Sequence, residues 1–312
     1  MQTPWGELEV SDAHAHFFSH GFFSALAKQK FAQAGQQPAE SAAGIAALLG
    51  WEPAPQDPEE LGRRWTAELD RCGVRRAALI ASVPGDEQSV AAAVRSYPQR
   101  FYGYFMVNPV APDASAHVQA ALAGGGLHCV CLFPAMHGYA MHDERVKPVL
   151  DAAAAFPRTA VFVHCGVLTV GVRRKLGLPS PFDMRYSNPI DLHGVALRYP
   201  KIKFIVPHFG AGYFREALML CDLCPNVYMD TSSSNAWMRY YAETLDLDVV
   251  FRRALDVAGA RRLLFGSDSS FFPRGWHAAI FEAQSAALER VGVSAADARS
   301  IFGDNLAMIF AG

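Results

Sequence analysis

The sequence predicts an α/β protein built as a single (β/α)8 TIM barrel. Strand-like and helix-like segments alternate in one continuous series of eight units. The strand-like segments are apolar along most of their length, as parallel strands buried on both faces are. Several of them end on a His or an Asp, and the active sites of such barrels form where the strands end. We expect one domain over residues 1–312, with residues 53–55 as a local spacer and not a boundary.

The first strand carries two histidines at alternate positions. Apolar residues 8–10 lead into Asp-Ala-His-Ala-His, in which the histidines are His14 and His16. Side chains at i and i+2 of a strand point to the same face, so both imidazoles can converge on one divalent metal ion. Residues 17–57 follow, rich in aromatic residues and without a strong strand. They predict a helical insertion over the barrel mouth.

The remaining units follow in order. The helix after the insertion spans residues 58–72, where Leu61, Trp65 and Leu69 recur at helical spacing. Later strands are predicted at residues 76–82, 101–107, 128–133, 160–165, 202–208, 227–231 and 262–267. The helices after them are predicted at residues 86–97, 113–123, 143–156, 189–199, 212–223, 243–258 and 275–291. Extra helical turns close the chain, with Ser294 as the expected N-cap.

An open, doubly wound sheet is the alternative fold. Such a sheet would place a Gly-rich phosphate loop after the first strand, where this chain has Asp-Ala-His-Ala-His. The three glycines at 124–126 follow a helix and precede a strand, which suits a tight turn and not anion binding. The closed barrel is therefore preferred.

Three further polar residues stand at the ends of apolar strands. His164 ends the fifth strand, His208 ends the sixth and Asp268 follows the eighth. In a barrel, the carboxyl ends of all strands meet at one mouth. These side chains and the two histidines of the first strand should therefore surround a single opening, and His and Asp are residue types that bind divalent metals.

This set of motifs resembles the amidohydrolase superfamily, in particular its amidohydrolase-related (type 2) branch, which includes aminocarboxymuconate-semialdehyde decarboxylase. The matching motifs are Asp-x-His-x-His at the start, Val-His-Cys-Gly at His164, Val-Pro-His-Phe-Gly at His208 and Leu-Phe-Gly-Ser-Asp at Asp268. The closing Ile-Phe-Gly-Asp-Asn-Leu-Ala at 301–307 also resembles this branch, so the resemblance covers nearly the whole chain.

The resemblance implies one divalent metal ion held by His14, His16, His164 and Asp268, with His208 beside the metal-bound water. Dinuclear members carry a carboxylated lysine at the end of strand four, but residues 130–134 contain no lysine. We therefore expect a mononuclear site. Three imidazoles and one carboxylate suit zinc, although manganese and iron accept the same ligand types.

The expected activity is that of a metal-dependent hydrolase. Metal-activated water would attack a carbonyl of a small organic acid, ester, lactone or amide, with Asp268 as general base. His208 would orient that water or stabilise the oxyanion. The alternative is a non-oxidative decarboxylase (a carboxy-lyase) of an unsaturated or aromatic acid, because the resemblance covers both reactions. A barrel without chemistry, acting as a binding protein, would lack a ligand, and none is missing. Some lactonases of this branch work without metal.

The substrate pocket is expected to come from the loops after the strands. Arginines could bind a carboxylate bidentately, and aromatics from several loops favour a partly apolar substrate. The candidate substrate-binding residues are Arg173, Arg174, Arg185, His137, Tyr139, Trp237, Arg274 and Trp276.

Composition excludes several classes of partner. The net charge is −2 at pH 7 without a basic block, which argues against nucleic acid or an anionic membrane. No long apolar run predicts a membrane span, and the first residues do not look like a secretory signal. The chain has 6 cysteines, which we expect to be reduced thiols of a cytoplasmic protein. The expected partner is a small-molecule substrate, and assembly into a homo-oligomer stays open.

Overall fold

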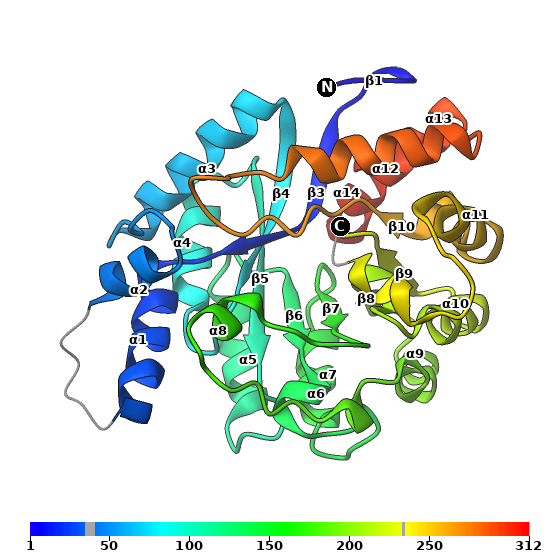
Figure 1. Ribbon diagram of the computed structural model, residues 1–312. Coiled ribbons are helices and arrows are strands. Elements are labelled where there is room, and N and C mark those ends of the chain that lie inside the picture. Colours follow the sequence, from blue (N-terminus) through cyan, green and yellow to red (C-terminus); the bar gives the residue numbers. More distant parts are fainter. Residues whose placement is uncertain (35–40, 233–234, 312) are drawn as a thin grey trace.

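The computed structural model describes residues 1–34, 41–232 and 235–311. Eight parallel strands form the predicted barrel, with helices around the outside (Figure 1). Their order in the sheet is their order in the chain. The strands are β3 (Val10–Phe17), β4 (Val74–Ala81), β5 (Phe101–Val107), β6 (Cys129–Leu132), β7 (Ala160–Val163), β8 (Lys203–Val206), β9 (Val227–Asp230) and β10 (Leu263–Leu264). All eight lie within or beside the predicted strands, so the predicted fold class is confirmed.

Backbone hydrogen bonds between β3 and the segment after β10 close the barrel. Ala13 N–H donates to the Phe265 carbonyl at 2.8 Å, and His16 N–H donates to the Ser269 carbonyl at 2.8 Å. In the other direction, Asp268 N–H donates to the His14 carbonyl at 3.0 Å. The two segments that carry the predicted metal ligands are therefore held side by side, although they lie at opposite ends of the sequence.

The helices on the outside follow the predicted series. They are α3 (Pro58–Cys72), α4 (Glu87–Ser96), α5 (Ala114–Ala123), α7 (Lys147–Ala154), α9 (His193–Arg198), α10 (Phe214–Leu223), α11 (Leu247–Ala258) and α12 (Ala278–Arg290). Several begin later than predicted. Asp246 caps α11 by accepting from Val249 N–H at 2.8 Å, and Gly275 before α12 has a positive φ of 67°. Among the described helices, none is both long and apolar enough to cross a lipid bilayer.

The insertion after β3 is helical, as predicted. It contains α1 (His20–Ala34) and α2 (Ala42–Leu48), and the part of the predicted insertion at 35–40 lies outside the described residues. Two side chains of α1 contact the loop after β7, which contains α8 (Gly171–Lys175). Lys30 Nζ donates to the Leu176 carbonyl at 2.7 Å, and Gln29 accepts from Arg173 at 2.5 Å. The insertion and this loop therefore pack against each other.

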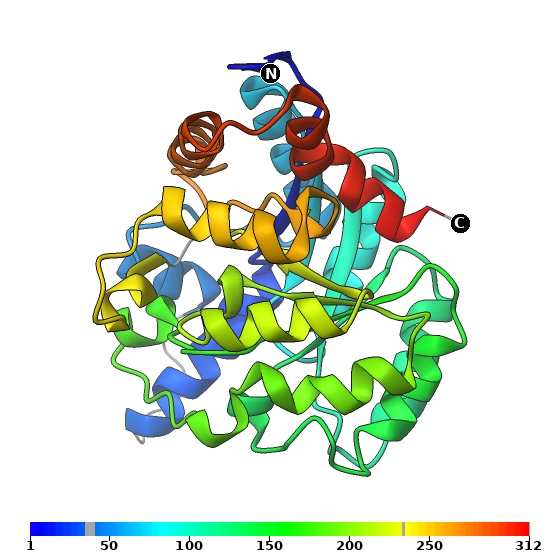
Figure 2. The same ribbon diagram turned by 90° about the vertical axis from the view of Figure 1, so that its right-hand side faces the viewer.

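The N-terminal hairpin packs against the segment that precedes the closing helices. A hairpin that the sequence did not predict, β1 (Gln2–Thr3) with β2 (Gly6–Glu7), precedes the barrel. Trp5 Nε1 donates to the Val293 carbonyl at 2.7 Å, next to the closing helices α13 (Ala295–Arg299) and α14 (Asn305–Phe310) (Figure 2). The predicted N-cap Ser294 is confirmed, since its hydroxyl accepts from Asp297 N–H.

Alternate residues of the strands build two separate apolar clusters. The inner cluster fills the barrel and includes Ile80, Tyr104, Cys131 and Phe162, together with Phe310 of α14. The outer cluster packs the other strand faces against the helices. The ring centroids of Phe310 and Tyr102 are 4.7 Å apart. Since α14 fills the barrel near the start of β5, access to the interior comes from the carboxyl ends of the strands.

Asp12 ties β3 to the segment after β10 inside the wall. Its buried carboxylate accepts from the N–H groups of His14 at 2.9 Å and Ser267 at 3.0 Å, and from the Ser267 hydroxyl. It also accepts from the indole N–H of Trp276 at 2.7 Å. Asp12 is thus a structural residue of the barrel wall. Strict alternation would put it on the face of His14, but the register shift between Asp12 and Ala15 breaks that alternation.

We expect Asp12→Asn to destabilise the protein. The asparagine amide would turn its NH2 group toward a group that donates to the carboxylate in the wild type. A buried donor left without an acceptor costs about 1–3 kcal/mol of stability. Urea unfolding of the metal-free protein measures the change. Asp183→Asn is the matched control, because Asp183 forms an ion pair with the exposed Arg185 and its replacement should leave stability nearly unchanged. Equal stability of both variants would contradict the role given to Asp12.

Candidate metal centre

Two histidines of β3 and the aspartate after β10 form a compact cluster. Ligand atoms of His14, His16 and Asp268 all lie within 4.8 Å of one another. His16 Nε2 is 3.2 Å from Asp268 Oδ1, and His14 Nε2 is 3.7 Å from the same oxygen. Among the described residues this is the group that could hold a metal ion. The prediction that these three side chains converge at the barrel mouth agrees with this geometry.

The cluster opens on the side of His16 and Asp268. Their side chains are 26% and 21% exposed, whereas that of His14 is 3% exposed. The His14 ring is 5.5 Å from the Phe162 ring of the inner cluster. A small molecule therefore reaches the cluster from the His16 side and meets His14 at the bottom of the site.

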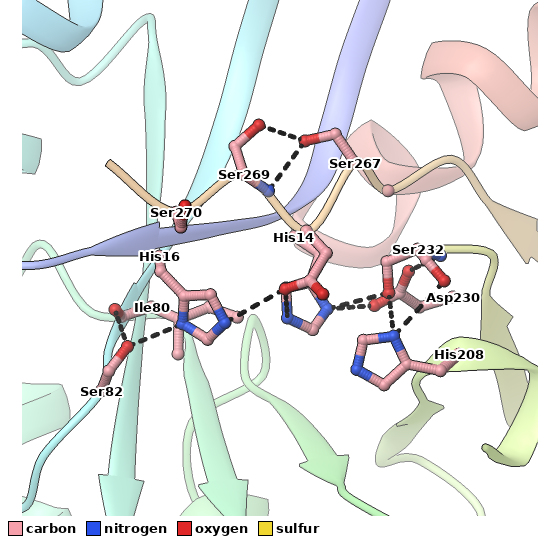
Figure 3. Close-up of polar contacts among 12 residues, drawn as sticks. His14, His16, Ile80, Ser82, His208, Asp230, Ser232, Ser267, Ser269 and Ser270 are labelled. Atoms are coloured by element: carbon pink, nitrogen blue, oxygen red, sulfur yellow. Dashed lines mark hydrogen bonds and ion pairs between the residues drawn. The ribbon is translucent and has the colours of Figure 1, made fainter. Parts of the chain in front are cut away.

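Both histidines are oriented by hydrogen bonds on the far side of their rings. His14 Nδ1 is 2.6 Å from Asp230 Oδ2, and His16 Nδ1 is 2.7 Å from Ser82 Oγ (Figure 3). Since each Nδ1 has a partner, each Nε2 faces Asp268. Asp230 ends β9 and is fully buried. Asp230 stands near the end of a predicted strand, as the histidines do, whereas no pattern in the sequence singled out Ser82.

Strained backbone positions the residues at two strand ends. Asp268 has a φ of 56°, and His208 and Phe209 after β8 have φ values of 55° and 52°. A positive φ is uncommon for residues other than Gly, and such strain concentrates at functional sites. At Gly166, an added Cβ would lie 2.1 Å from the Gly210 carbonyl oxygen. Only glycine permits this close approach of the loops after β7 and β8.

His208 lies beside the cluster. Its ring centroid is 5.0 Å from that of His14. Its Nδ1 is 2.9 Å from Ser232 Oγ and 3.3 Å from the Ser232 carbonyl oxygen (Figure 3). Burial lowers the pKa of His208. The prediction places His208 next to the reactive centre, and this geometry is compatible with it.

His164 lies beside His208, outside the compact group of ligand atoms. Its ring centroid lies 5.5 Å from that of His208, and its ring stacks on Phe133 at 5.5 Å. The compact group of ligand atoms contains His14, His16 and Asp268 without it. Burial, with the nearby rings of His208 and His14, keeps the pKa of His164 well below its usual range. Its buried Nδ1 has no hydrogen-bond partner among the described residues. Its role as a fourth ligand stays a prediction.

The electrostatics of the cluster favour a positive charge at its centre. Burial opposes ionisation of Asp268, but the hydrogen bond with His16 and the charges of His14 and His208 lower its pKa below the usual range. Burial also disfavours protonation of His14, yet the carboxylates of Asp230 and Asp268 raise its pKa to about 9. The surrounding carboxylates thus stabilise a cation among these side chains. Two imidazole nitrogens and a carboxylate oxygen are ligands that zinc and similar ions accept, so the residues fit a divalent metal.

Three predicted substrate-binding aromatics are buried in the outer cluster. Tyr139, Trp237 and Trp276 have exposed fractions of 1%, 2% and 2%. The indole N–H of Trp276 is bound to Asp12, and Trp237 packs on Phe214 with ring centroids 5.7 Å apart. Their rings are buried among other apolar residues, and their contact with substrate stays a prediction.

Three of the four predicted arginines contact residues near their own positions in the chain, and Arg173 also contacts Gln29 of the insertion. Arg173 donates to the Pro179 carbonyl at 2.6 Å, and Arg274 donates to the Ser270 hydroxyl at 2.8 Å. Arg185 is exposed and pairs with Asp183, and Arg174 is also exposed. His137 is half-buried at the end of α6 (Pro134–His137), which follows β6. The structure does not gather these side chains around the cluster, and their role in substrate binding stays a prediction.

Comparisons with known proteins show the family and agree with the fold. A family model described as Amidohydrolase matches residues 11–310, and the chain therefore belongs to this family. Protein fluG of Emericella nidulans is 32% identical over 87 residues, which are 28% of this chain. The chain spans only 10% of the length of that protein.

Solved structures share the fold at low sequence identity. A 5-carboxyvanillate decarboxylase from Novosphingobium aromaticivorans with bound manganese is 17% identical with a TM-score of 0.65, covering 97% of each chain. A zinc-bound amidohydrolase from Burkholderia multivorans is 14% identical with a TM-score of 0.60, covering 97% of this chain and 99% of its own. A probable 2-pyrone-4,6-dicarboxylic acid hydrolase from Acinetobacter baumannii has the same identity, coverage and TM-score.

Proposed function

We propose that this chain is a mononuclear, divalent-metal-dependent hydrolase that acts on a carbonyl group of a small organic acid, ester, lactone or amide. The observation that carries the proposal is the convergence of His14 Nε2, His16 Nε2 and Asp268 Oδ1 at the open end of the barrel. These residues would hold the ion. The buried His164 Nδ1, which has no hydrogen-bond partner among the described residues, supports the addition of His164 as a further ligand. Zinc suits this donor set best, and the structural relatives with zinc and manganese support an ion of this type.

The chain's own residues have distinct roles in the proposed reaction. The ion, when bound, would supply Lewis-acid activation of water and of the substrate carbonyl. Asp268, ionised at neutral pH, would accept a proton from the attacking water. His208 would face the oxygen that gains charge. Phe162 and Phe133, in ring contact with His14 and His164, give the interior an apolar wall that favours a partly apolar substrate.

The test is an assay of metal-loaded and chelator-treated protein on a panel of lactones, esters, amides and unsaturated or aromatic acids. We expect hydrolysis that disappears with the metal and returns when zinc or manganese is added back. Release of CO2 from an acid, without hydrolysis, would instead identify a decarboxylase on the same scaffold. Full activity in protein shown by elemental analysis to contain no metal would contradict the metal-dependent mechanism.

Removing the carboxylate behind His14 should weaken metal binding. A carboxylate on the distal nitrogen of a ligand imidazole fixes its orientation and tautomer, and its loss typically costs about 10–100-fold in metal affinity. We therefore expect Asp230→Asn to raise the dissociation constant for zinc by this factor, measured by competition with a chromophoric chelator. Asp183→Asn, on an exposed loop, is the control. An unchanged zinc affinity in Asp230→Asn would show that His14 is not a ligand oriented by Asp230.

A further inference from the structure

The Ser232 hydroxyl lies between the imidazoles of two site histidines. Ser232 Oγ is 3.1 Å from His14 Nδ1 and 2.9 Å from His208 Nδ1, and the residue is fully buried (Figure 3). Ser232 comes two residues after Asp230, the last residue of β9, and its N–H donates to Asp230 Oδ1 at 2.7 Å. One short segment therefore contacts both His14 of β3 and His208 after β8.

The proton on His14 Nδ1 is assigned by its carboxylate partner. His14 Nδ1 and Asp230 Oδ2 are 2.6 Å apart, and an ionised carboxylate can only accept. The proton therefore sits on Nδ1 of His14, and it stays there when Nε2 binds an ion. Ser232 Oγ, next to the same nitrogen, can accept from it but cannot donate to it.

His208 Nδ1 is then the one acceptor for the Ser232 hydroxyl proton among the contacts of this hydroxyl with the described residues. The opposite arrangement would put a proton on His208 Nδ1 and direct it to the Ser232 carbonyl oxygen, which is further away at 3.3 Å. That arrangement would leave the buried hydroxyl proton of Ser232 without an acceptor, and buried donors are nearly always satisfied.

We infer that Ser232 is a positioning residue that holds His208 as the tautomer with its hydrogen on Nε2. In this tautomer His208 is a hydrogen-bond donor on the ring edge away from Ser232, suited to a substrate oxygen that gains negative charge. It has no free lone pair with which to accept a proton from water. Asp268 is then the proton acceptor of the site. The functional part of this inference rests on the proposed hydrolase function, but the tautomer itself does not.

Long-range ¹H–¹⁵N NMR of histidine-labelled protein tests the inference directly, because it distinguishes the two neutral tautomers. The His208 signals are assigned by their absence in His208→Asn. In metal-free and zinc-loaded wild-type protein we expect the Nε2–H tautomer. In Ser232→Ala we expect His208 to shift toward the Nδ1–H form, directed at the backbone carbonyl of residue 232. Ser232→Thr keeps the hydroxyl and should restore the wild-type tautomer.

Kinetics give the second readout. With the best substrate of the panel, Ser232→Ala should lower kcat at least tenfold with little change in KM, and Ser232→Thr should recover most of kcat. Two results would overturn the inference: an Nδ1–H tautomer of His208 in the wild type, or an unchanged His208 tautomer in Ser232→Ala. The first is measured on the wild type and does not depend on how well a variant folds. An inactive protein with the expected tautomer would refute the proposed function and leave the positioning role of Ser232 intact.

Discussion

Replacing Asp268 with asparagine should abolish turnover while leaving the barrel folded. The amide cannot accept a proton from water and carries no charge for a cation, so two contributions are lost together. General-base catalysis alone supplies about 10²–10⁴-fold in rate, and we expect kcat/KM to fall by at least about 10³-fold. Asparagine tolerates a positive φ nearly as well as aspartate. The substitution should therefore leave the backbone of residue 268, with its φ of 56°, unchanged.

The measurement for Asp268→Asn is kcat/KM at saturating metal, with circular dichroism and urea unfolding to confirm the fold. The backbone bond from residue 268 to the His14 carbonyl, at 3.0 Å, does not involve the side chain and should persist. Asp183→Asn is the control, because it makes the same chemical change at the ion pair with the exposed Arg185. If the activity of Asp268→Asn lies within tenfold of the wild type, Asp268 is not the general base of the reaction.

Replacing His208 with asparagine should slow the reaction and leave the metal in place. His208 lies 5.0 Å from His14 between ring centroids but outside the compact group of ligand atoms. Loss of one oriented donor to a developing oxyanion costs about 10²–10³-fold in kcat, and we expect a loss of this size. Because asparagine suits the φ of 55° at this position, the loop should keep its shape.

Elemental analysis separates this role from that of a ligand. The His208→Asn protein should retain the metal content of the wild type after the same dialysis, with KM changed far less than kcat. If the variant loses its metal, His208 is a ligand and the assignment of the cluster needs revision. A wild-type rate in the variant would show that His208 does not act on the substrate.

Much of this architecture could be predicted because its signals are local or follow from the barrel. Apolar runs such as β5 and β7 identify buried parallel strands, and the barrel then brings strand ends together regardless of sequence separation. His14, His16 and Asp268 could be placed around one opening by that rule alone. The later starts of α11 and α12 were missed because Asp246 and Gly275 act through cap and turn geometry that helical periodicity does not reveal.

The side-chain details were less accessible from the sequence. His164 stands at a strand end as predicted, but which ring it touches depends on packing against Phe133 and His208. Trp237 and Trp276 occupy predicted loops, yet apolar loop residues gain more from burial against helices than from exposure at the mouth. Ser82 follows β4 directly and Ser232 stands two residues after β9, so including hydroxyl residues near strand ends in the same search would have found both.

A crystal of the protein grown with zinc or manganese, with data collected on either side of the metal's absorption edge, tests the central claim most directly. We predict one strong anomalous peak within coordinating distance of His14 Nε2, His16 Nε2 and Asp268 Oδ1, and its disappearance in a crystal of His16→Asn. A peak elsewhere, or none in a crystal soaked with either metal, would contradict the assignment of this cluster as the metal centre.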